Sequence, residues 1–270
     1  MADFKYALNA STIRPASIMD KIKIAAEAGY SGIELWHDEI DDHLHAGGAL
    51  SDLRKALDDL GLAVPTTIYL KGWFETTGDE YLLELDECKR RMEQSVVLGA
   101  PYIIAGPPGG AADYAVGAAH YHELLAIGRE IGVMPAMEFL GFVEQLNTIE
   151  DALDVMTRAG DENATTVVDP FHIFRGGGSV ESLAKLAARQ IAVSHFNDVP
   201  ATPARELQHD KDRVMPGDGE FDLSRYVELL RRIGYNRFLS LELFREDLWA
   251  QDPLEVARVG LDKMRSVVEG

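Results

Sequence analysis

The residues of this chain that are best suited to chemistry lie at the ends of four consecutive predicted strands. Asp169 and His172 follow a short β-branched run that is typical of a buried strand. Glu138, His195 and Glu242 occupy the matching places on the neighbouring predicted strands. Carboxylates and imidazoles are the groups that most often bind metal ions or transfer protons in proteins. Four consecutive predicted strands therefore end in residues that are suited to binding a metal ion or transferring a proton.

Two of these carboxylates are costly to bury. Glu138 and Glu242 each stand alone within an apolar run, where an ionised carboxylate is unfavourable unless it is paired or bound to a metal ion. Taken singly, a buried glutamate is more often salt-bridged than metal-bound, and a buried histidine is more often a hydrogen-bonded core residue. The coincidence on four strands favours a shared site. Three carboxylates and one imidazole suit one divalent cation, and Mn²⁺, Mg²⁺, Co²⁺ and Zn²⁺ all fit this set.

The elements that must position these residues alternate regularly along the chain. Hydrophobic runs predict strands near residues 4–9, 32–36, 63–70, 102–105, 133–139, 165–168, 191–196 and 238–244. Amphipathic helices are expected between them, near 17–29, 50–60, 81–98, 114–131, 148–159, 180–189, 222–234 and from 252 onward.

Strands that alternate with helices indicate a parallel sheet, and eight strands can close a barrel. We therefore expect an α/β protein with a single (β/α)8 TIM barrel domain over residues 1–270. The alternative is an open doubly wound sheet, but the first strand–helix turn lacks a Gly-rich dinucleotide fingerprint. In a TIM barrel the active site lies at the C-terminal ends of the strands, where the four candidate ligands are expected.

Composition limits the classes of partner. The chain of 270 residues is 46% hydrophobic and carries 26 Lys and Arg against 45 Asp and Glu, a net charge of −19. Nucleic acid and anionic membranes would repel such a chain, so a small molecule is the expected partner. The single cysteine excludes an intrachain disulfide. We see no signal peptide and no apolar run near the roughly 18 residues of a membrane span, which favours a cytoplasmic protein.

Five motifs resemble those of the xylose-isomerase-like TIM barrels that are grouped as sugar phosphate isomerases and epimerases, and most closely the inosose (2-keto-myo-inositol) isomerase type. They are Met-Glu-Phe-Leu-Gly at 137–141, Asp-Pro-Phe-His at 169–172, His-Phe-Asn-Asp at 195–198, Asp-Arg-Val-Met-Pro-Gly-Asp-Gly at 212–219 and Leu-Glu-Leu-Phe-Arg at 241–245. The likeness runs from about residue 95 to 250, and the earlier chain matches only in its strand–helix rhythm. The motifs are specific for the superfamily and less specific for one substrate.

The resemblance implies roles for individual residues. It implies one divalent metal ion, with Mn²⁺ the preferred candidate, held by Glu138, Asp169, His195 and Glu242. It also implies that Glu138 and Glu242 face opposite sides of a bound sugar and exchange its proton, through an enediolate that the metal stabilises. His172 and Arg213 would bind substrate oxygens. The expected substrate is a keto-sugar or keto-inositol, and relatives of this type commonly form homo-oligomers.

Other features leave alternatives open. Trp36 and Trp73 follow predicted strands and are expected to bind substrate as walls of the sugar pocket, although packing at the rim is an equal alternative for both. His37 and two further histidines lie in an acidic segment that we interpret as a solvated loop rather than a second metal site. Three rival functions use the same fold: an inosose-type dehydratase, a non-catalytic sugar-binding barrel and a multi-zinc nuclease. The net charge argues against the nuclease.

Overall fold

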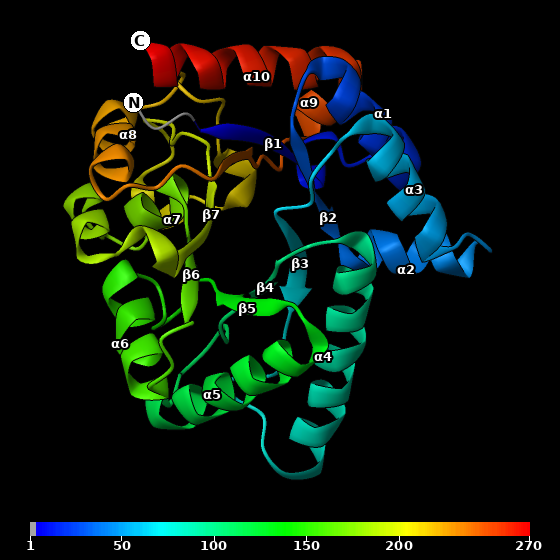
Figure 1. The fold of residues 1–270 in the computed structure, drawn as a ribbon. Coiled ribbons are helices and arrows are strands. Elements are labelled where there is room, and N and C mark those ends of the chain that lie inside the picture. The colour runs from blue at the N-terminus through cyan, green and yellow to red at the C-terminus, as the bar shows by residue number, and fades with distance from the viewer. Residues whose placement is uncertain (1–3) are drawn as a thin grey trace.

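The computed structural model describes residues 4–270, which form a closed barrel of eight parallel strands inside a ring of helices (Figure 1). The strands pair in chain order, and the last pairs with the first. The expected (β/α)8 TIM barrel is confirmed. The strands are β1 (Lys5–Asn9), β2 (Gly32–Trp36), β3 (Thr66–Leu70), β4 (Tyr102–Ala105), β5 (Met134–Met137), β6 (Thr165–Val168), β7 (Ile191–His195) and β8 (Phe238–Leu241).

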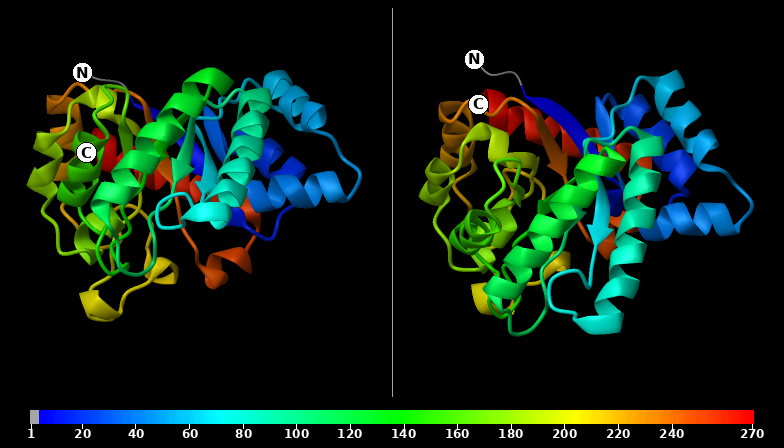
Figure 2. Two further views of the ribbon diagram at one scale, coloured as in Figure 1. Left: turned by 90° about the horizontal axis from the view of Figure 1, so that it is seen from below. Right: turned by 60° about the horizontal axis from the view of Figure 1, so that its bottom comes forward.

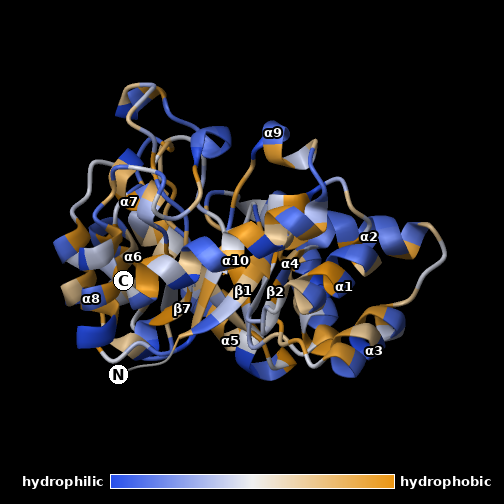
Figure 3. Cartoon of the chain, turned by 90° about the horizontal axis from the view of Figure 1, so that it is seen from above, coloured by the Kyte–Doolittle hydropathy of each residue, from blue (hydrophilic) through white to orange (hydrophobic). Residues whose placement is uncertain are grey.

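The helices cover the outside of the barrel, and hydrophobic stretches alternate with hydrophilic ones along most of them, as expected when one face covers a core (Figure 3). The C-terminal helix packs against the first one, which closes the ring. Among residues 4–270, no helix has the length and apolar character that crossing a membrane requires. The helices are α1 (Ile18–Ala28), α2 (His37–His45), α3 (Leu50–Leu60), α4 (Gly78–Leu98), α5 (Tyr114–Ile131), α6 (Ile149–Ala159), α7 (Pro170–Arg175), α8 (Leu223–Arg232), α9 (Glu246–Trp249) and α10 (Pro253–Glu269).

The two faces of each strand pack differently, because successive side chains point to opposite sides. One face contributes to the large apolar cluster that joins strands and helices. Strands β3 to β7 also contribute to a small separate apolar cluster, made of Ile68, Ile104, Ala136, Val167, Ala192 and Val193. Since all strands run parallel, their C-terminal ends meet at one end of the barrel, where the loops after β3, β7 and β8 gather (Figure 2).

Three segments differ from the sequence-based prediction. The acidic segment after β2 is helix α2 rather than a solvated loop. Residues 170–175, expected as loop, form the short helix α7, which Asp169 caps by accepting a hydrogen bond from the backbone of Phe171 at 2.7 Å. The helix expected at 180–189 is instead two 3-10 turns, η2 (Val180–Lys185) and η3 (Ala188–Gln190), separated by extended backbone at Leu186.

The histidine at the start of α2 is a core residue. His37 is fully buried, with Nδ1 2.8 Å from Gln94 Oε1 and Nε2 3.2 Å from Thr67 Oγ1. Ion pairs of Glu39 with Lys21 and of Asp41 with Arg90 attach the helix to its neighbours. These tertiary contacts explain why the segment is helical although it has no side-chain N-cap.

Candidate active site

The candidate ligands lie on the inner face of the barrel at its C-terminal end. His195 is the last residue of β7, while Glu138, Asp169 and Glu242 each come directly after a strand. Each lies two positions beyond another residue on the inward face, so the two-residue period of the strands points all four in the same direction. The preceding inward residues are Ala136, Val167, Val193 and Ser240.

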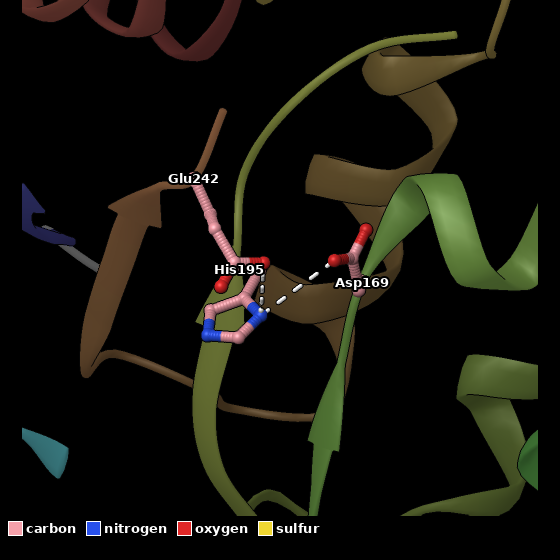
Figure 4. Close-up of side chains that lie close together, drawn as sticks. All are labelled: Asp169, His195 and Glu242. Atoms are coloured by element: carbon pink, nitrogen blue, oxygen red, sulfur yellow. Dashed lines mark ion pairs between the residues drawn. The ribbon is translucent and has the colours of Figure 1, made fainter. Parts of the chain in front are cut away.

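Asp169, His195 and Glu242 place one candidate ligand atom each within 4.8 Å of the other two. The shared point is Nδ1 of His195, which lies 3.0 Å from Glu242 Oε2 and 3.6 Å from Asp169 Oδ2 (Figure 4). All three residues are buried. The three side chains converge from neighbouring strands, as the sequence predicts.

Glu138 lies beside this group. Its Oε1 is 3.5 Å from Nδ1 of His195, and its side chain is the most exposed of the four. Burial in the barrel raises the pKa of Glu138 to about 8, an effect that His195 opposes and that the carboxylates of Glu242 and Asp169 reinforce. A carboxyl group with a pKa near neutrality is suited to exchange a proton with a substrate.

Two cations balance the buried carboxylates. Arg213 is 1% exposed; its Nη1 donates to Asp169 Oδ2 at 2.8 Å and also contacts Glu242. Burial alone would raise the pKa of Asp169, but the charge of Arg213, followed by the imidazoles of His172 and His195, holds this pKa well below its usual range. Burial alone would lower the pKa of His195, but Glu242 and Glu34 outweigh burial and raise it well above its usual value.

His172 joins Arg213 at the inner wall. Its Nε2 lies 2.9 Å from Nη2 of Arg213, and because arginine only donates, this nitrogen must accept. Arg213 Nη2 also donates to Asp210 Oδ1 at 2.7 Å. Burial lowers the pKa of His172 to about 4, so its imidazole is neutral at physiological pH. The two residues expected to bind substrate oxygens are therefore in direct contact with each other.

The donor set fits a divalent cation. Both ring nitrogens of His195 are buried and lack a hydrogen-bond partner among residues 4–270; Nε2 faces Glu34, and Nδ1 faces the carboxylates of Glu242, Glu138 and Asp169. A buried polar atom without a partner is uncommon and is explained by an ion at this point. The nearby ligands are carboxylate oxygens and one imidazole, a set that Mn²⁺, Mg²⁺, Co²⁺ and Zn²⁺ all accept.

A cavity of about 390 Å³ opens directly above the ligands, within the range of small-molecule sites. Glu138, Glu242, His172 and Arg213 line it, and Trp36 forms part of its wall. The position of Trp73 differs from the expectation. Its ring is fully buried, donates from Nε1 to the Gly106 carbonyl at 2.9 Å and packs on aromatic neighbours, so it supports the rim from beneath and does not line the cavity.

The sequence-based prediction omitted Glu34. It lies in the middle of β2, is 0% exposed, and its Oε2 is 3.4 Å from Nε2 of His195. Glu34 stands alone in the apolar run Gly-Ile-Glu-Leu-Trp, which is the same signal that singled out Glu138 and Glu242. Applied to all eight strands, that signal predicts Glu34 as well.

Asp198 positions the loop that carries Arg213. Its main chain exchanges two 3.0 Å hydrogen bonds with Val214. Its carboxylate accepts four more from backbone N–H groups farther along the loop, at 2.8 to 3.1 Å, from Val199, Gly217, Gly219 and Phe221. A Cβ at Gly219 would collide with Asp198, so only glycine allows this close approach. One buried side chain thus organises a long irregular connection.

The chain belongs to the xylose isomerase-like TIM barrel family, whose pattern it matches over residues 22–267. The family resemblance drawn from the motifs is thereby confirmed. Among individual relatives, inosose isomerase of Bacillus velezensis is 28% identical over 96% of this chain and 95% of its own. A 3-dehydroshikimate dehydratase of Pseudomonas aeruginosa is 25% identical over 85% of this chain, which spans 36% of that longer protein.

Solved structures agree on the fold. The crystal structure of the IOLI protein with a bound zinc atom superposes with a TM-score of 0.90, at 24% identity over 98% of both chains. D-psicose 3-epimerase, solved in the presence of D-fructose, superposes with a TM-score of 0.78, at 19% identity over 99% of this chain and 100% of its own. At such identities the likeness establishes the barrel architecture.

Proposed function

We propose that this protein is a divalent-metal-dependent isomerase or epimerase that transfers a proton within a keto-sugar or keto-inositol of the inosose type. The observation that carries this proposal is the position of Glu138 and Glu242, two carboxylates that line one cavity beside the ligand atom of His195. The inosose isomerases that match nearly the full chain support the substrate class. The size of the cavity suits a monosaccharide or cyclitol.

The ion would be held by Asp169, His195 and Glu242, with Glu138 as the fourth ligand. When bound, a divalent cation supplies Lewis acidity to the substrate carbonyl and its neighbouring hydroxyl. Mn²⁺ remains our preferred ion; the zinc of the IOLI structure makes Zn²⁺ the first alternative to test.

The chain's own residues perform the proton transfer. One of the two glutamates removes the proton next to the carbonyl, and the same or the opposite glutamate returns it, which gives an isomer or an epimer. Without a metal ion, burial raises the pKa of Glu138 to about 8. A bound divalent cation would lower this pKa, so proton transfer by Glu138 depends on its position at the cavity beside the substrate carbon. Arg213 keeps a permanent positive charge next to the cavity and stabilises the negative charge that develops on the substrate oxygen. His172 lines the same cavity and orients Arg213, whose Nη2 lies 2.9 Å from Nε2 of the imidazole.

An inosose-type dehydratase is the second candidate, and the 3-dehydroshikimate dehydratases among the relatives favour it. Elimination needs an acid at the departing hydroxyl. Burial lowers the pKa of His172 to about 4, and a nearby cation would lower it further, so His172 holds no proton to give at neutral pH. This difference is why we place proton transfer ahead of elimination.

Deuterium exchange tests the proposal. The protein is incubated in D₂O with Mn²⁺ and, separately, an inosose, fructose, tagatose or psicose, and NMR follows deuterium at the carbon next to the carbonyl. We expect exchange with formation of an isomer, loss of exchange with a chelator, and loss in Glu138→Gln. The matched control is Glu150→Gln, which removes a carboxylate that pairs with Lys185 on the outer surface and should leave exchange unchanged.

The product separates the candidates. Exchange with loss of water identifies a dehydratase, because elimination creates an ultraviolet-absorbing enone. Sugar binding that survives a chelator, with no exchange on any compound, identifies a non-catalytic sugar-binding barrel and refutes the enzymatic proposal.

A further inference from the structure

Glu34 is a buried charged residue that the reaction as described does not use. It lies on the inner face of β2, and four polar groups surround its carboxylate. Asn9 donates to it from Nδ2 at 3.2 Å, and the hydroxyl groups of Thr66 and Ser240 donate as well. The fourth neighbour is Nε2 of His195, 3.4 Å from Oε2. A carboxylate with this many donors is held both ionised and immobile.

The ring of His195 lies between two carboxylate groups of different kinds. Nε2 faces Glu34, away from the cavity, whereas Nδ1 faces Glu242, Asp169 and Glu138 at 3.0 to 3.6 Å. An imidazole that binds a metal ion carries a proton on one nitrogen and presents a lone pair on the other. A carboxylate behind one nitrogen keeps the proton there and leaves the opposite nitrogen free to coordinate.

Asn9 orients the carboxylate of Glu242 in a similar way. Its Oδ1 accepts from Trp36 Nε1 at 2.8 Å and from the backbone of Ser11 at 3.1 Å, so the amide cannot turn over without losing both bonds. Its Nδ2 must then point inward, where it donates to Glu34 and to Glu242 Oε1 at 3.0 Å. Oε1 of Glu242 is thereby occupied, and Oε2 remains on the side of His195 Nδ1.

We propose that Glu34 is a positioning residue for the metal ligand His195: it keeps the proton on Nε2 and so directs Nδ1 to the ion. The inference rests on the metal site of the proposed function. It assigns the coordinating atoms, Nδ1 of His195 and Oε2 of Glu242. The residue that selects Nδ1 lies on β2, on the side of His195 away from the cavity. Glu34 touches neither the ion nor the substrate.

Glu34→Gln tests this role, because it keeps the side-chain shape and removes the charge. The amide has one neutral acceptor oxygen in place of the charged carboxylate. Its NH₂ group faces the same groups that donated hydrogen bonds to the carboxylate. The interaction that keeps the proton on Nε2 of His195 is therefore weaker. Zinc affinity is measured by competition with a chromophoric chelator. We expect the dissociation constant to rise roughly 10- to 100-fold, the usual effect of removing a partner that orients a metal-bound histidine.

The coordinating nitrogen is read directly from the zinc-loaded protein. Two-bond ¹H–¹⁵N correlation spectra of the histidine rings distinguish a metal-bound Nδ1 from a metal-bound Nε2. In the wild type we expect one His195 species with the proton on Nε2 and zinc on Nδ1. In Glu34→Gln we expect a mixture, or loss of the Nδ1-bound species. A residue that only stabilised the fold would lower the melting temperature without changing the coordinating nitrogen.

Glu39→Gln is the matched control. Glu39 is a largely buried carboxylate that pairs with the buried Lys21 on the outside of the barrel, so its loss should lower stability but leave zinc affinity and the His195 spectrum unchanged. If Glu34→Gln does not fold, Glu34→Asp replaces it: the shorter side chain retracts from Nε2, and the same rise in dissociation constant is expected.

The outcomes separate this inference from the proposed function. If the wild type does not bind zinc through His195, the metal site itself is wrong. If the wild type binds zinc through Nδ1, and Glu34→Gln does so with the same affinity, the metal site stands and the role of Glu34 is refuted. Zinc bound through Nε2 in the wild type would refute it equally.

Discussion

Arg213 offers the sharpest test of how this barrel accommodates its buried carboxylates. The guanidinium bonds to Asp169 and contacts Glu242, both expected metal ligands, and reaches Asp210 with its other nitrogen. Replacing it by methionine keeps much of the volume and removes the charge and all donors. Without metal, Asp169 and Glu242 would then keep their neutral hydrogen-bond donors and the imidazole of His195, but they would lose the charge of the guanidinium.

The magnitude follows from burial. Arg213 is 1% exposed, and removing one partner of a buried ion pair costs about 3–5 kcal/mol, because the remaining charges stay buried. For a chain of this size each kcal/mol lowers the melting temperature by roughly 2 °C or slightly more, so metal-free Arg213→Met should melt at least about 6 °C below the metal-free wild type. A divalent cation among the same carboxylates replaces the missing charge. The loss should therefore shrink markedly when Mn²⁺ or Zn²⁺ is present.

Calorimetric melting of both proteins, with chelator and with excess metal, measures the difference. The control is Arg225→Met, which removes an arginine that pairs with two glutamates, Glu181 and Glu228, on the surface. Surface pairs contribute roughly 0.2–1 kcal/mol, so the control should lose little and should lose it equally with and without metal. An equal loss for Arg213→Met under both conditions would show that the guanidinium and the ion do not compensate the same charges.

Three further outcomes are expected. Asp198→Asn should lower the melting temperature, because backbone donors left without an acceptor cost about 1–3 kcal/mol. It should also expose residues 199–222 to limited proteolysis, with the cleavage sites identified by mass spectrometry. Burial lowers the pKa of His37 to about 4, so between about pH 6.5 and 4 this histidine binds a proton in the unfolded state but not in the folded state. The free energy of unfolding should therefore fall by up to about 3 kcal/mol as the pH drops through this window. Urea titrations at pH 7 and 5 should show a smaller fall for His37→Gln than for the wild type. Trp36→Ala should raise KM for the sugar in steady-state assays because the ring lines the cavity, and it should also lower kcat because Asn9, which orients Glu242, loses the bond from Nε1.

The sequence allowed the barrel and the four candidate ligands to be predicted because both depend on short-range regularities. Strand and helix periods alternate along the chain, and the two-residue period of a strand points Glu138, Asp169, His195 and Glu242 to one face. A lone charge in an apolar run is also visible without a structure. The same reasoning reaches Glu34 on β2 only when every strand is examined, since nothing in its local sequence links it to His195.

What the sequence did not predict depends on distant partners. Helix α2 lacks a side-chain cap and is stabilised by ion pairs to α1 and α4, which no local pattern reveals. The short helix α7 did carry a local signal, an Asp cap followed by Pro, but three glycines at 176–178 follow it at once, and glycines are typical of a loop. Trp73 follows a strand just as Trp36 does; only packing around its ring distinguishes the buried indole from the one at the cavity.

The site combines a base that the strands provide with a wall that an irregular loop provides. Glu34 and Asn9 come from strands and are fully buried; Asn9 donates hydrogen bonds to Glu34 and Glu242, and Glu34 faces Nε2 of His195 at 3.4 Å. Arg213, in contrast, comes from an irregular loop that Asp198 anchors. Changes in that loop alter the shape and charge of the cavity while the strands keep the ligand atoms in place. On a TIM barrel, substrate preference can therefore change through the loops while the strands stay the same, and the relatives of this chain include both inosose isomerases and 3-dehydroshikimate dehydratases.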